Sequence, residues 1–457
     1  MDLIAGLAKN VVATRYEDIP GEALDVAKMS LLDSIGTMVA GAAAPGCSIL
    51  VDQVREWGGR EESTVMMYGQ KVPAHNAALI NSVMARALDF DDAMDRGMHL
   101  GASLNATALA LAERRGNATG RDLLTALVMG ADVAGRINFA TEDYHGFDPT
   151  LTCGVFGTTA TAAKLLALDE EQTLNALGLA FNECSGTFQS NIDGALSVRL
   201  NQGLASSEGI VCALLAKRGM TGVKNVLQGV YGYFHLYSND KCGAHHLTED
   251  LGKKFYGTEM LFKRWPSCGG TLMATDAAYE LVQQHQIDAA DVEQVTVRVH
   301  PYLYNLVGHP FKIGEHPVVD AQFSLQYTLA NVIVRKRPVL QHFTPEYIRD
   351  PEVLVLAEKV KTVKDTSLPD QDYLSTDVEI RLRDGTRLSK HVDCMKGHPS
   401  NPLHLAEIVD KYQENVSIAG RPLPKGITDK ITQWIDKLEE LDDVTRIPSL
   451  LVWDSRS

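Results

Sequence analysis

The stretch ALDFDDAMDRGMHLGAS, residues 87–103, holds four aspartates, an arginine and a histidine. Residues 74–88 before it and 105–113 after it have the apolar, alanine-rich composition of buried helices, and Gly97 marks a break between them. Because buried charge is costly and a helix junction can direct side chains into a cleft, we interpret this stretch as a candidate site. The alternative is an exposed connector in which Arg86 and Asp89 pair at i,i+3.

Helical patterns surround this stretch from residue 1 to about residue 265. Apolar residues recur at helical spacing in residues 20–42, 120–140, 157–168, 169–181 and 203–218, while alternating strand patterns are nearly absent. The segment Gly154–Gly157 (GVFG) predicts close helix packing rather than a nucleotide loop. Residues 1–265 therefore predict an all-helical domain, and residues 399–457, with expected helices at 403–414 and 425–441, are expected to complete it.

The pattern changes near residue 265. A helix at 271–285 precedes VEQVTVRV (292–299), whose alternation predicts a strand, and further helices are expected at 321–334 and 351–360. Residues 377–383 and 386–392 predict a hairpin that turns at Asp384-Gly385. The fold class is therefore mainly α, a large all-helical domain plus a smaller α+β domain at 266–398. A small-molecule site is expected in a cleft between the two.

Composition excludes several classes of function. The net charge of −15 over 457 residues argues against a nucleic-acid partner and against binding to an anionic membrane. We find no secretory signal and no apolar run of spanning length, so we expect a cytoplasmic protein. The seven cysteines form no C-x-x-C pair, and there is no H-E-x-x-H, Walker loop or dinucleotide-binding motif. We therefore expect neither a metal nor a cofactor.

The order of several motifs resembles the MmgE/PrpD family. The segments that carry the resemblance are LDFDDAMDRGMHLGAS (88–103), GFDPTLTCGVFGTTATAAKLLAL (146–168), VRLNQGLASSEG (198–209), KRWPSCGGT (263–271), AQFSLQYTLA (321–330) and GHPSNPLHLAEIVDKY (397–412). The resemblance implies a helical domain with an α+β lid, a homodimer, no cofactor, and a small di- or tricarboxylate substrate bound between the domains. Dehydratases, decarboxylases and epimerases of such acids occur in the family.

Four residues match the family's functional positions. Asp89 matches the first acid of the D-F-D-D run, and His99 matches the histidine ten residues later. Lys263 matches the lysine that opens the K-x-[FY]-P-S segment, and Arg199 matches the arginine of a K-R-L-H run. The resemblance implies that Asp89, His99 and Lys263 converge in one site.

Five positions depart from the family pattern. Asp148 stands where the family commonly has the histidine of G-F-H-P, and Ala93 stands where a threonine often follows D-F-D-D. Val198 and Asn201 replace the lysine and histidine of K-R-L-H. Cys268 stands where decarboxylase-like members have histidine, although cysteine is common in dehydratase-like members. The decarboxylase pattern is thus broken, while Asn201 and Cys268 remain candidate substrate-binding residues.

The shared chemistry is proton transfer at the carbon next to a carboxylate. Such a carbon acid is weak, so a positioned base must act while cations stabilise the developing charge. Lys263, Arg199, Arg264 and Arg136 are candidate cations, and an arginine suits bidentate carboxylate binding. These cations would also draw an anionic substrate to an acidic protein.

His99 is the candidate acid or base, since it titrates near neutral pH and Asp89 could orient it. If the reaction is an epimerisation, two groups on opposite faces of the substrate exchange the proton, and Tyr144, His145 and Asp148 are candidates for the second group. Three classes of function remain: a 2-methylcitrate-dehydratase-like hydro-lyase, which we rank first, an isomerase or epimerase of an iminodisuccinate-like acid, and a non-catalytic carboxylate-binding homologue.

Overall fold

The computed structural model describes residues 2–368, 374–420 and 422–453. The chain forms two compact units. The first unit comprises Met1–Leu261 together with His404–Ser457, and the second comprises Phe262–Leu403. The expected mainly-α fold class, with a smaller α+β part, is confirmed.

The first unit is built almost wholly of helices, and its two-residue strands β1 (Ser63–Thr64) and β2 (Lys71–Val72) form a short antiparallel pair. Its helices are α1 (Ile4–Ala13), α2 (Gly21–Gly41), α3 (Cys47–Trp57), α4 (Ala74–Arg86), α5 (Gly101–Arg115), α6 (Gly120–Ala140), α7 (Pro149–Thr152), α8 (Gly154–Leu165), α9 (Glu170–Ala180), α10 (Gln189–Ile192), α11 (Leu200–Lys217), α12 (Tyr233–Ser238), α13 (Ala244–Thr248), α20 (Leu405–Ser417), α21 (Ile427–Asp436) and α22 (Arg446–Leu450).

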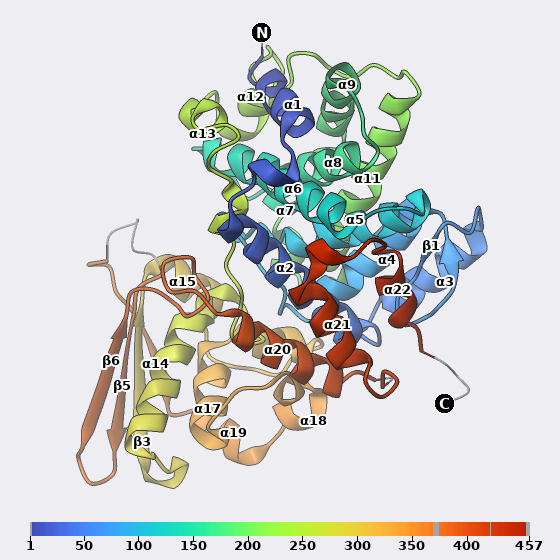
Figure 1. Cartoon of the computed structure of the whole chain (residues 1–457). Helices are drawn as coiled ribbons and strands as arrows, with labels where there is room; N and C mark the ends of the chain where they lie inside the picture. The colour runs from blue at the N-terminus through green and yellow to red at the C-terminus, as the bar shows by residue number, and fades with distance from the viewer. Residues whose placement is uncertain (1, 369–373, 421, 454–457) are drawn as a thin grey trace. The chain divides into compact units, whose positions relative to one another are not determined.

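Glycine lets the central helices of this unit approach closely. A Cβ on Gly157 of α8 would lie 2.8 Å from the carbonyl oxygen of Gly130 in α6, so the expected close packing at GVFG is confirmed. A Cβ on Gly36 of α2 would lie 3.1 Å from the Tyr412 ring of α20. The C-terminal helices α20 and α21 therefore pack against α2, near the other end of the sequence (Figure 1).

Helix α6 corrects one expectation. Among the described residues it is the helix long and apolar enough to cross a membrane, although we had found no run of spanning length. Its boundaries, however, are the predicted ones, and Thr119 caps it by accepting a hydrogen bond from the Asp122 backbone N–H. Because 94% of its apolar window is buried within the protein, α6 has the burial of a core helix.

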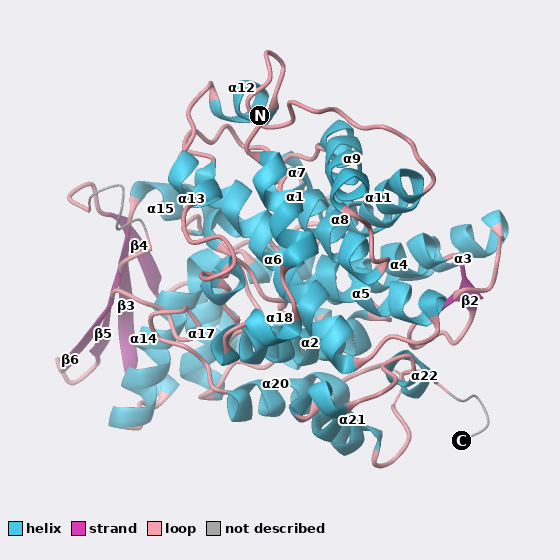
Figure 2. Cartoon of the chain, turned by 45° about the horizontal axis from the view of Figure 1, so that its top comes forward, coloured by secondary structure: helices cyan, strands magenta, loops and turns pink. Residues whose placement is uncertain are grey.

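The second unit contains a four-stranded sheet in the order β4-β3-β5-β6, with β4 parallel to β3 and the other pairs antiparallel. Helices α14 and α17 pack against this sheet (Figure 2). The strands are β3 (Val292–Val299), β4 (Val360–Lys364), β5 (Thr376–Leu382) and β6 (Arg387–Val392), and the helices are α14 (Gly269–His285), α15 (Pro301–Val307), α16 (Pro317–Gln322), α17 (Leu325–Arg335), α18 (Pro345–Ile348) and α19 (Pro351–Ala357).

Most elements predicted for this unit are present, but two predictions are wrong. The single helix expected at 321–334 is two helices, because Ser324 caps α17 by accepting a hydrogen bond from the Tyr327 backbone N–H. Residue 360, expected at the end of a helix, instead begins β4, which the sequence interpretation missed. Strand β3 and the hairpin of β5 and β6 are confirmed.

Candidate active site

The acid-rich stretch lies in the first unit, between the end of α4 and the start of α5. We call residues 88–92 the acid turn. Asp89 is 6% exposed, and Asp91 and Asp92 are fully buried. The alternative interpretation, an exposed connector, is therefore wrong. Asp89 has a φ of +51°, in the left-handed region that is unfavourable for residues other than glycine, so the surrounding structure must hold this turn in place.

Arg86, the last residue of α4, supplies the nearest positive charge. Its Nη1 lies 2.7 Å from Asp89 Oδ1 and 3.8 Å from Asp91 Oδ1. Burial alone would lower the pKa of Arg86, but the neighbouring carboxylates raise it above its ordinary value. The side-chain amide of Gln202 in α11 is oriented so that both its nitrogen and its oxygen have hydrogen-bond partners. In this orientation the oxygen accepts a hydrogen bond from Arg86 Nε at 3.3 Å. The i,i+3 pair of Arg86 and Asp89 thus exists, but it is buried.

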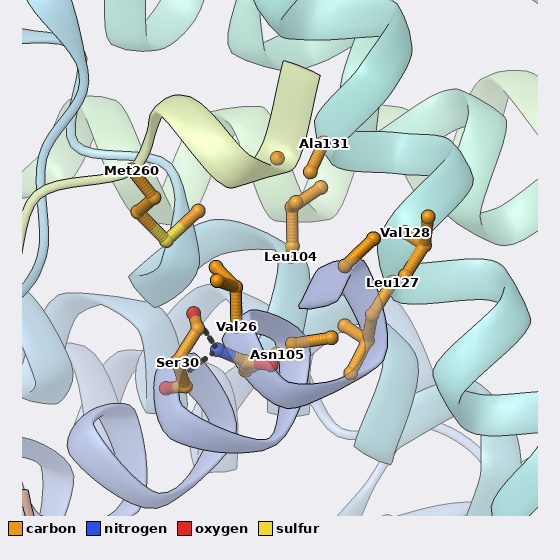
Figure 3. Close-up of a pocket in the computed structure, with 11 residues that line it drawn as sticks. Val26, Ser30, Leu104, Asn105, Leu127, Val128, Ala131 and Met260 are labelled. Carbon is orange, nitrogen blue, oxygen red and sulfur yellow. Dashed lines mark hydrogen bonds between the residues drawn. The ribbon is translucent and has the colours of Figure 1, made fainter. Parts of the chain in front are cut away.

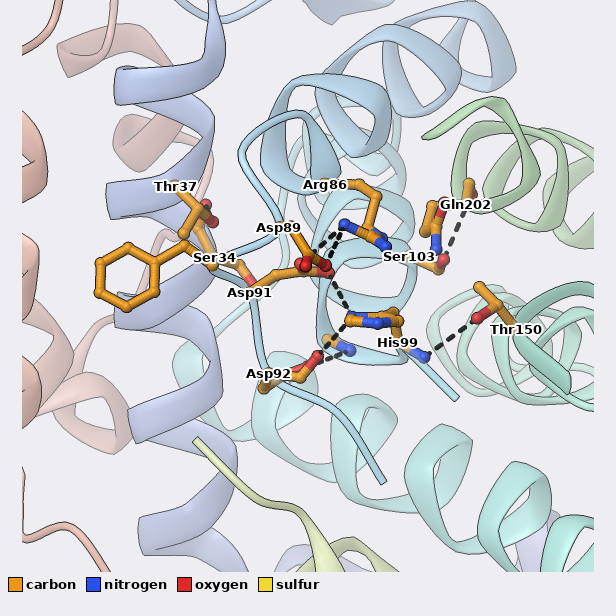
Figure 4. Close-up of polar contacts among 12 residues, drawn as sticks. Ser34, Thr37, Arg86, Asp89, Asp91, Asp92, His99, Ser103, Thr150 and Gln202 are labelled. Atoms are coloured by element: carbon orange, nitrogen blue, oxygen red, sulfur yellow. Dashed lines mark hydrogen bonds and ion pairs between the residues drawn. The ribbon is translucent and has the colours of Figure 1, made fainter. Parts of the chain in front are cut away.

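His99 faces the acid turn through one ring nitrogen (Figure 4). Its Nδ1 lies 3.2 Å from Asp91 Oδ2 and 3.1 Å from the Asp92 carbonyl oxygen. Because both neighbours are acceptors, Nδ1 carries the hydrogen in the neutral ring and the lone pair lies on Nε2. The His99 backbone N–H donates to Thr150 Oγ1 at 3.0 Å, which fixes the residue to the start of α7.

The acid beside His99 is therefore Asp91, which the sequence interpretation missed. We had considered Asp89 as the acid that orients the ring; Asp89 pairs with Arg86 at 2.7 Å, and Asp91 makes the 3.2 Å contact to His99 Nδ1. The D-F-D-D motif contains acids at both residue 89 and residue 91. The left-handed backbone at residue 89 determines how each of them is directed relative to His99.

Asp92 has a different environment from its neighbours. Its Oδ2 accepts a hydrogen bond from Ser30 Oγ at 2.6 Å, and its Oδ1 accepts from the Gly101 backbone N–H at 2.8 Å. Burial, together with nearby acids such as Asp33, raises the pKa of Asp92 to about 8. Asp92 is thus held as a buried acid that carries a proton over part of the neutral range.

The volumes of two cavities in the described part of the chain show whether each could hold a substrate. The cavity beside Ser30 and Asn105 measures about 20 Å³, which is room for about one water molecule and not for a polycarboxylate (Figure 3). A cavity of about 960 Å³ lies along β4 in the second unit, lined by Tyr304, Gln326 and Lys361 among others. No residue that we predicted for the site lines either cavity.

Asp148 and Asn201, two of the departures from the family pattern, are hydrogen-bonded to each other. Asn201 Nδ2 donates to Asp148 Oδ2 at 2.7 Å, and the Thr150 backbone N–H donates to Asp148 Oδ1 at 2.9 Å. Asp148 is 3% exposed and caps the N-terminus of α7. Both of its carboxylate oxygens thus have protein partners, which is the environment of a capping residue rather than of the catalytic group that we had expected.

The other candidates from this region differ in their contacts. The Tyr144 hydroxyl donates to the Phe147 carbonyl oxygen. His145 is on the surface, where its Nε2 lies 2.7 Å from Asn239 Nδ2 and 3.5 Å from Asp143 Oδ1. This surface position gives His145 no contact with the acid turn among the interactions of the described residues.

The candidate arginines of the first unit also have different roles. Arg136 is fully buried, pairs with Asp132 at 2.9 Å and donates to the carbonyl oxygens of His246, Glu249 and Lys254. It clamps the segment after α12, so our expectation that it binds substrate is wrong. Arg199 donates to the Pro45 carbonyl oxygen at 3.0 Å, and burial lowers its pKa despite nearby Cys47 and Asp89.

The candidates of the second unit lie at the start of α14. Lys263 is 2% exposed. The Arg264 guanidinium stacks over the Trp265 and Tyr279 rings and lies 3.5 Å from Asp276 Oδ1. Cys268 is the N-cap residue of α14, and its backbone N–H donates to the Gln322 carbonyl oxygen. The position of Lys263 relative to Asp89 and His99 stays a prediction.

Comparison with known proteins identifies the family. Residues 5–243 match the MmgE/PrpD N-terminal domain, and residues 265–422 match the MmgE/PrpD C-terminal domain. The chain belongs to the MmgE/PrpD family. Its relatives include cis-aconitate decarboxylase of Homo sapiens, 27% identical over 93% of this chain and 89% of the relative. The decarboxylase of Aspergillus terreus is 26% identical over 95% and 93%, and 2-methylcitrate dehydratase of Escherichia coli is 26% identical over 88% of each.

This MmgE/PrpD enzyme thus carries its acid turn, Asp91 and His99 within the matched N-terminal domain, and Lys263 just before the matched C-terminal domain. Because the decarboxylases and the dehydratase have similar identity to the chain, similarity alone does not select one reaction.

The acid turn of this MmgE/PrpD enzyme also has the donor types of a metal site. Within residues 2–368, 374–420 and 422–453, Asp89, Asp91 and His99 place ligand atoms within 4.8 Å of one another. Two carboxylates and an imidazole can bind divalent ions. Arg86 Nη1 already lies 2.7 Å from Asp89, however, so a divalent ion there would meet a fixed positive charge. The arrangement fits an internal ion pair better than a metal centre.

Proposed function

We propose that this protein is a cofactor-independent hydro-lyase that dehydrates a 2-methylcitrate-like tricarboxylate, and that it acts in the cytoplasm as a homodimer. The observation that carries the proposal is the contact between His99 Nδ1 and Asp91 Oδ2, 3.2 Å apart, in a buried turn. In the neutral ring this contact favours the hydrogen on Nδ1 and the lone pair on Nε2, and Nε2 is the proposed base that removes a proton.

In the proposed reaction, His99 Nε2 takes the proton from the carbon next to a carboxylate. The electron pair of that C–H bond forms the carbon–carbon double bond, and the hydroxyl group on the neighbouring carbon accepts a proton and leaves as water. Lys263, Arg199 and Arg264 are the proposed cations that hold the substrate carboxylates while negative charge develops. Arg86 is not assigned this role because its Nη1 already pairs with Asp89 at 2.7 Å.

The group that protonates the leaving hydroxyl is proposed to be Tyr144. Of the three residues considered for the second proton, Asp148 caps α7 through Oδ1 and accepts a hydrogen bond from Asn201 through Oδ2, and His145 lies on the surface beside Asn239. Tyr144, the residue before His145, has a phenolic hydroxyl that donates to the Phe147 carbonyl oxygen. A phenol can donate a proton to a departing oxygen.

One feature supports dehydration over decarboxylation, namely the hydrogen-bonded pair of Asp148 and Asn201. Human cis-aconitate decarboxylase is a relative, so this alternative has to be tested. At the positions of two family histidines, however, this chain has the bonded pair Asp148 and Asn201, which offers no positive charge to a substrate carboxylate. We therefore propose that decarboxylation of cis-aconitate is negligible.

The experiment is NMR of the protein in deuterated water with 2-methylcitrate, citrate, cis-aconitate and iminodisuccinate. A hydro-lyase produces an alkene acid and water, a decarboxylase releases CO₂, and an epimerase incorporates deuterium with inversion. We expect the first outcome, and we expect it to be lost in His99→Gln but kept in the control His235→Gln, a surface histidine paired with Asp240. Deuterium incorporation with inversion, or turnover that survives His99→Gln, would overturn the proposal.

A further inference from the structure

Lys411 of α20 is a buried lysine, only 6% exposed, and it makes three contacts in the first unit. Its Nζ lies 2.7 Å from Asp33 Oδ1 of α2 and donates to the Phe90 carbonyl oxygen at 2.6 Å. It also lies 3.9 Å from the centre of the Phe90 ring. A residue of the C-terminal helix therefore holds the middle of the acid turn, from 321 positions along the sequence.

The Phe90 carbonyl is well placed to control the turn. It belongs to the peptide group that joins Phe90 to Asp91, and it directly follows Asp89, the residue with a φ of +51°. A change in the direction of this peptide group would rotate Asp89 relative to Arg86 and Asp91 relative to His99. Since a hydrogen bond from a charged donor is about twice as strong as a neutral one, the ammonium group is a suitable anchor for a strained turn.

Charge compensation of Asp33 does not by itself account for Lys411. A buried ion pair adds little net stability, since the cost of removing both charges from water offsets their attraction. An apolar pair would fill the same space between α2 and α20. The contact that an apolar pair cannot replace is the one between Lys411 Nζ and the Phe90 carbonyl oxygen.

We propose that Lys411 is a positioning residue, which acts on the reaction by fixing the Phe90–Asp91 peptide and thereby the direction in which Asp91 meets His99. The effect on turnover rests on the proposed function, whereas the effect on the backbone of the acid turn does not. Lys411 itself is not expected to contact the substrate.

The test compares Asp33→Asn, the double variant Asp33→Asn/Lys411→Met, and wild type. Lys411→Met leaves the fully buried Asp33 without its countercharge and risks misfolding, whereas in Asp33→Asn the Lys411 ammonium keeps the Phe90 carbonyl oxygen and ring as partners. The double variant removes both charges. The matched control is Lys164→Met, because Lys164 Nζ also donates to backbone carbonyl oxygens, those of Val11, Val12 and Thr14, away from the acid turn.

Two readouts are measured on each variant: kcat on the acid that wild type converts, and hydrogen exchange of residues 88–101 followed by mass spectrometry. We expect Asp33→Asn to stay within about threefold of wild type and the double variant to lose about 10- to 100-fold in kcat with little change in KM, as is typical of residues that support a catalytic group. Exchange in the acid turn should be faster in the double variant alone.

If the double variant matches Asp33→Asn in kcat and in exchange, Lys411 only neutralises Asp33 and the proposal is wrong. If the control Lys164→Met loosens the acid turn as much, the effect is general destabilisation and the proposal is also wrong. Should wild type convert none of the acids, the proposed function fails, and the exchange data still decide whether Lys411 positions the turn.

Discussion

Replacing Asp91 by asparagine tests the part of the site that the structure defines best. The change keeps the shape of the side chain and removes its charge, so Nδ1 of His99 loses its carboxylate acceptor at 3.2 Å. The Asp92 carbonyl oxygen at 3.1 Å remains, and it still favours a hydrogen on Nδ1. Arg86 keeps its closer partner, Asp89, at 2.7 Å.

The remaining carbonyl acceptor sets the expected size of the effect. Where a carboxylate alone fixes the tautomer of a catalytic histidine, its loss lowers kcat by about 10⁴-fold. Here the hydrogen on Nδ1 is shared, so we expect the smaller loss that follows removal of a supporting group, about 10- to 100-fold in kcat. This corresponds to about 1.4–2.7 kcal/mol in activation free energy. KM should change little, because Asp91 is proposed to act through His99.

The assay is steady-state kinetics on the acid that wild type converts, with circular dichroism to verify folding. The control is Asp95→Asn, an acid of the same stretch that is 47% exposed and lies 4.0 Å from Arg96. We expect the control to stay within about twofold of wild type, as a surface change should. A folded Asp91→Asn enzyme with wild-type kcat, or an equal loss in the control, would refute the role of Asp91.

Three further predictions concern stability, metal independence and substrate choice. Because the pKa of Asp92 is raised from 3.8 to about 8, the folded state holds a proton that the unfolded state has lost between these values, so the free energy of unfolding should fall as pH rises from about 4 to about 8. Urea denaturation at pH 5 and pH 8 should show this slope in wild type and a smaller one in Asp92→Asn; equal slopes would contradict the burial of a protonated Asp92. Extensive treatment with a chelator should leave turnover intact, because Arg86 Nη1 lies 2.7 Å from Asp89 and would repel a divalent ion there. A loss that zinc or iron restores would show a metal site instead. Wild type should decarboxylate cis-aconitate more slowly than about 1 per second, the low end of typical turnover, and faster CO₂ release would count against dehydration as the reaction. The variant Asp148→His should lower the free energy of unfolding by about 1 kcal/mol through loss of the α7 cap, and an unchanged stability would count against Asp148 as the cap.

The sequence pattern marked the buried acid turn but not the pairing of its side chains. Local patterns sufficed for the helix junction around the acid turn and for the strand β3, because periodicity and breaker residues act over short distances. The sequence did not predict that Asp91, rather than Asp89, contacts His99 Nδ1. That contact depends on the left-handed backbone conformation of residue 89, which no residue pattern indicates. Strand β4 was missed because its alternating residues directly follow a short apolar helix.

The contacts that were missed also join distant parts of the sequence. Asp148 and Asn201 are 53 positions apart, and each looked like an isolated departure from a motif until their hydrogen bond paired them. Arg136 looked like a candidate cation, yet its partners are backbone carbonyl oxygens more than 100 positions away, which no residue pattern reveals. Side chains that bind backbone groups leave little trace in a single sequence.

The return of α20 to α2 has a consequence for how the protein is made. A ribosome extends a chain at roughly 5–20 residues per second, so about 15–60 seconds pass between the synthesis of Phe90 and that of Lys411, which is 321 positions later. During that time Asp33 has no Lys411 to pair with, and the face of α2 that later packs against Tyr412 is open to solvent or to chaperones. The acid turn can therefore reach its final form only after the whole of the second unit has been synthesised.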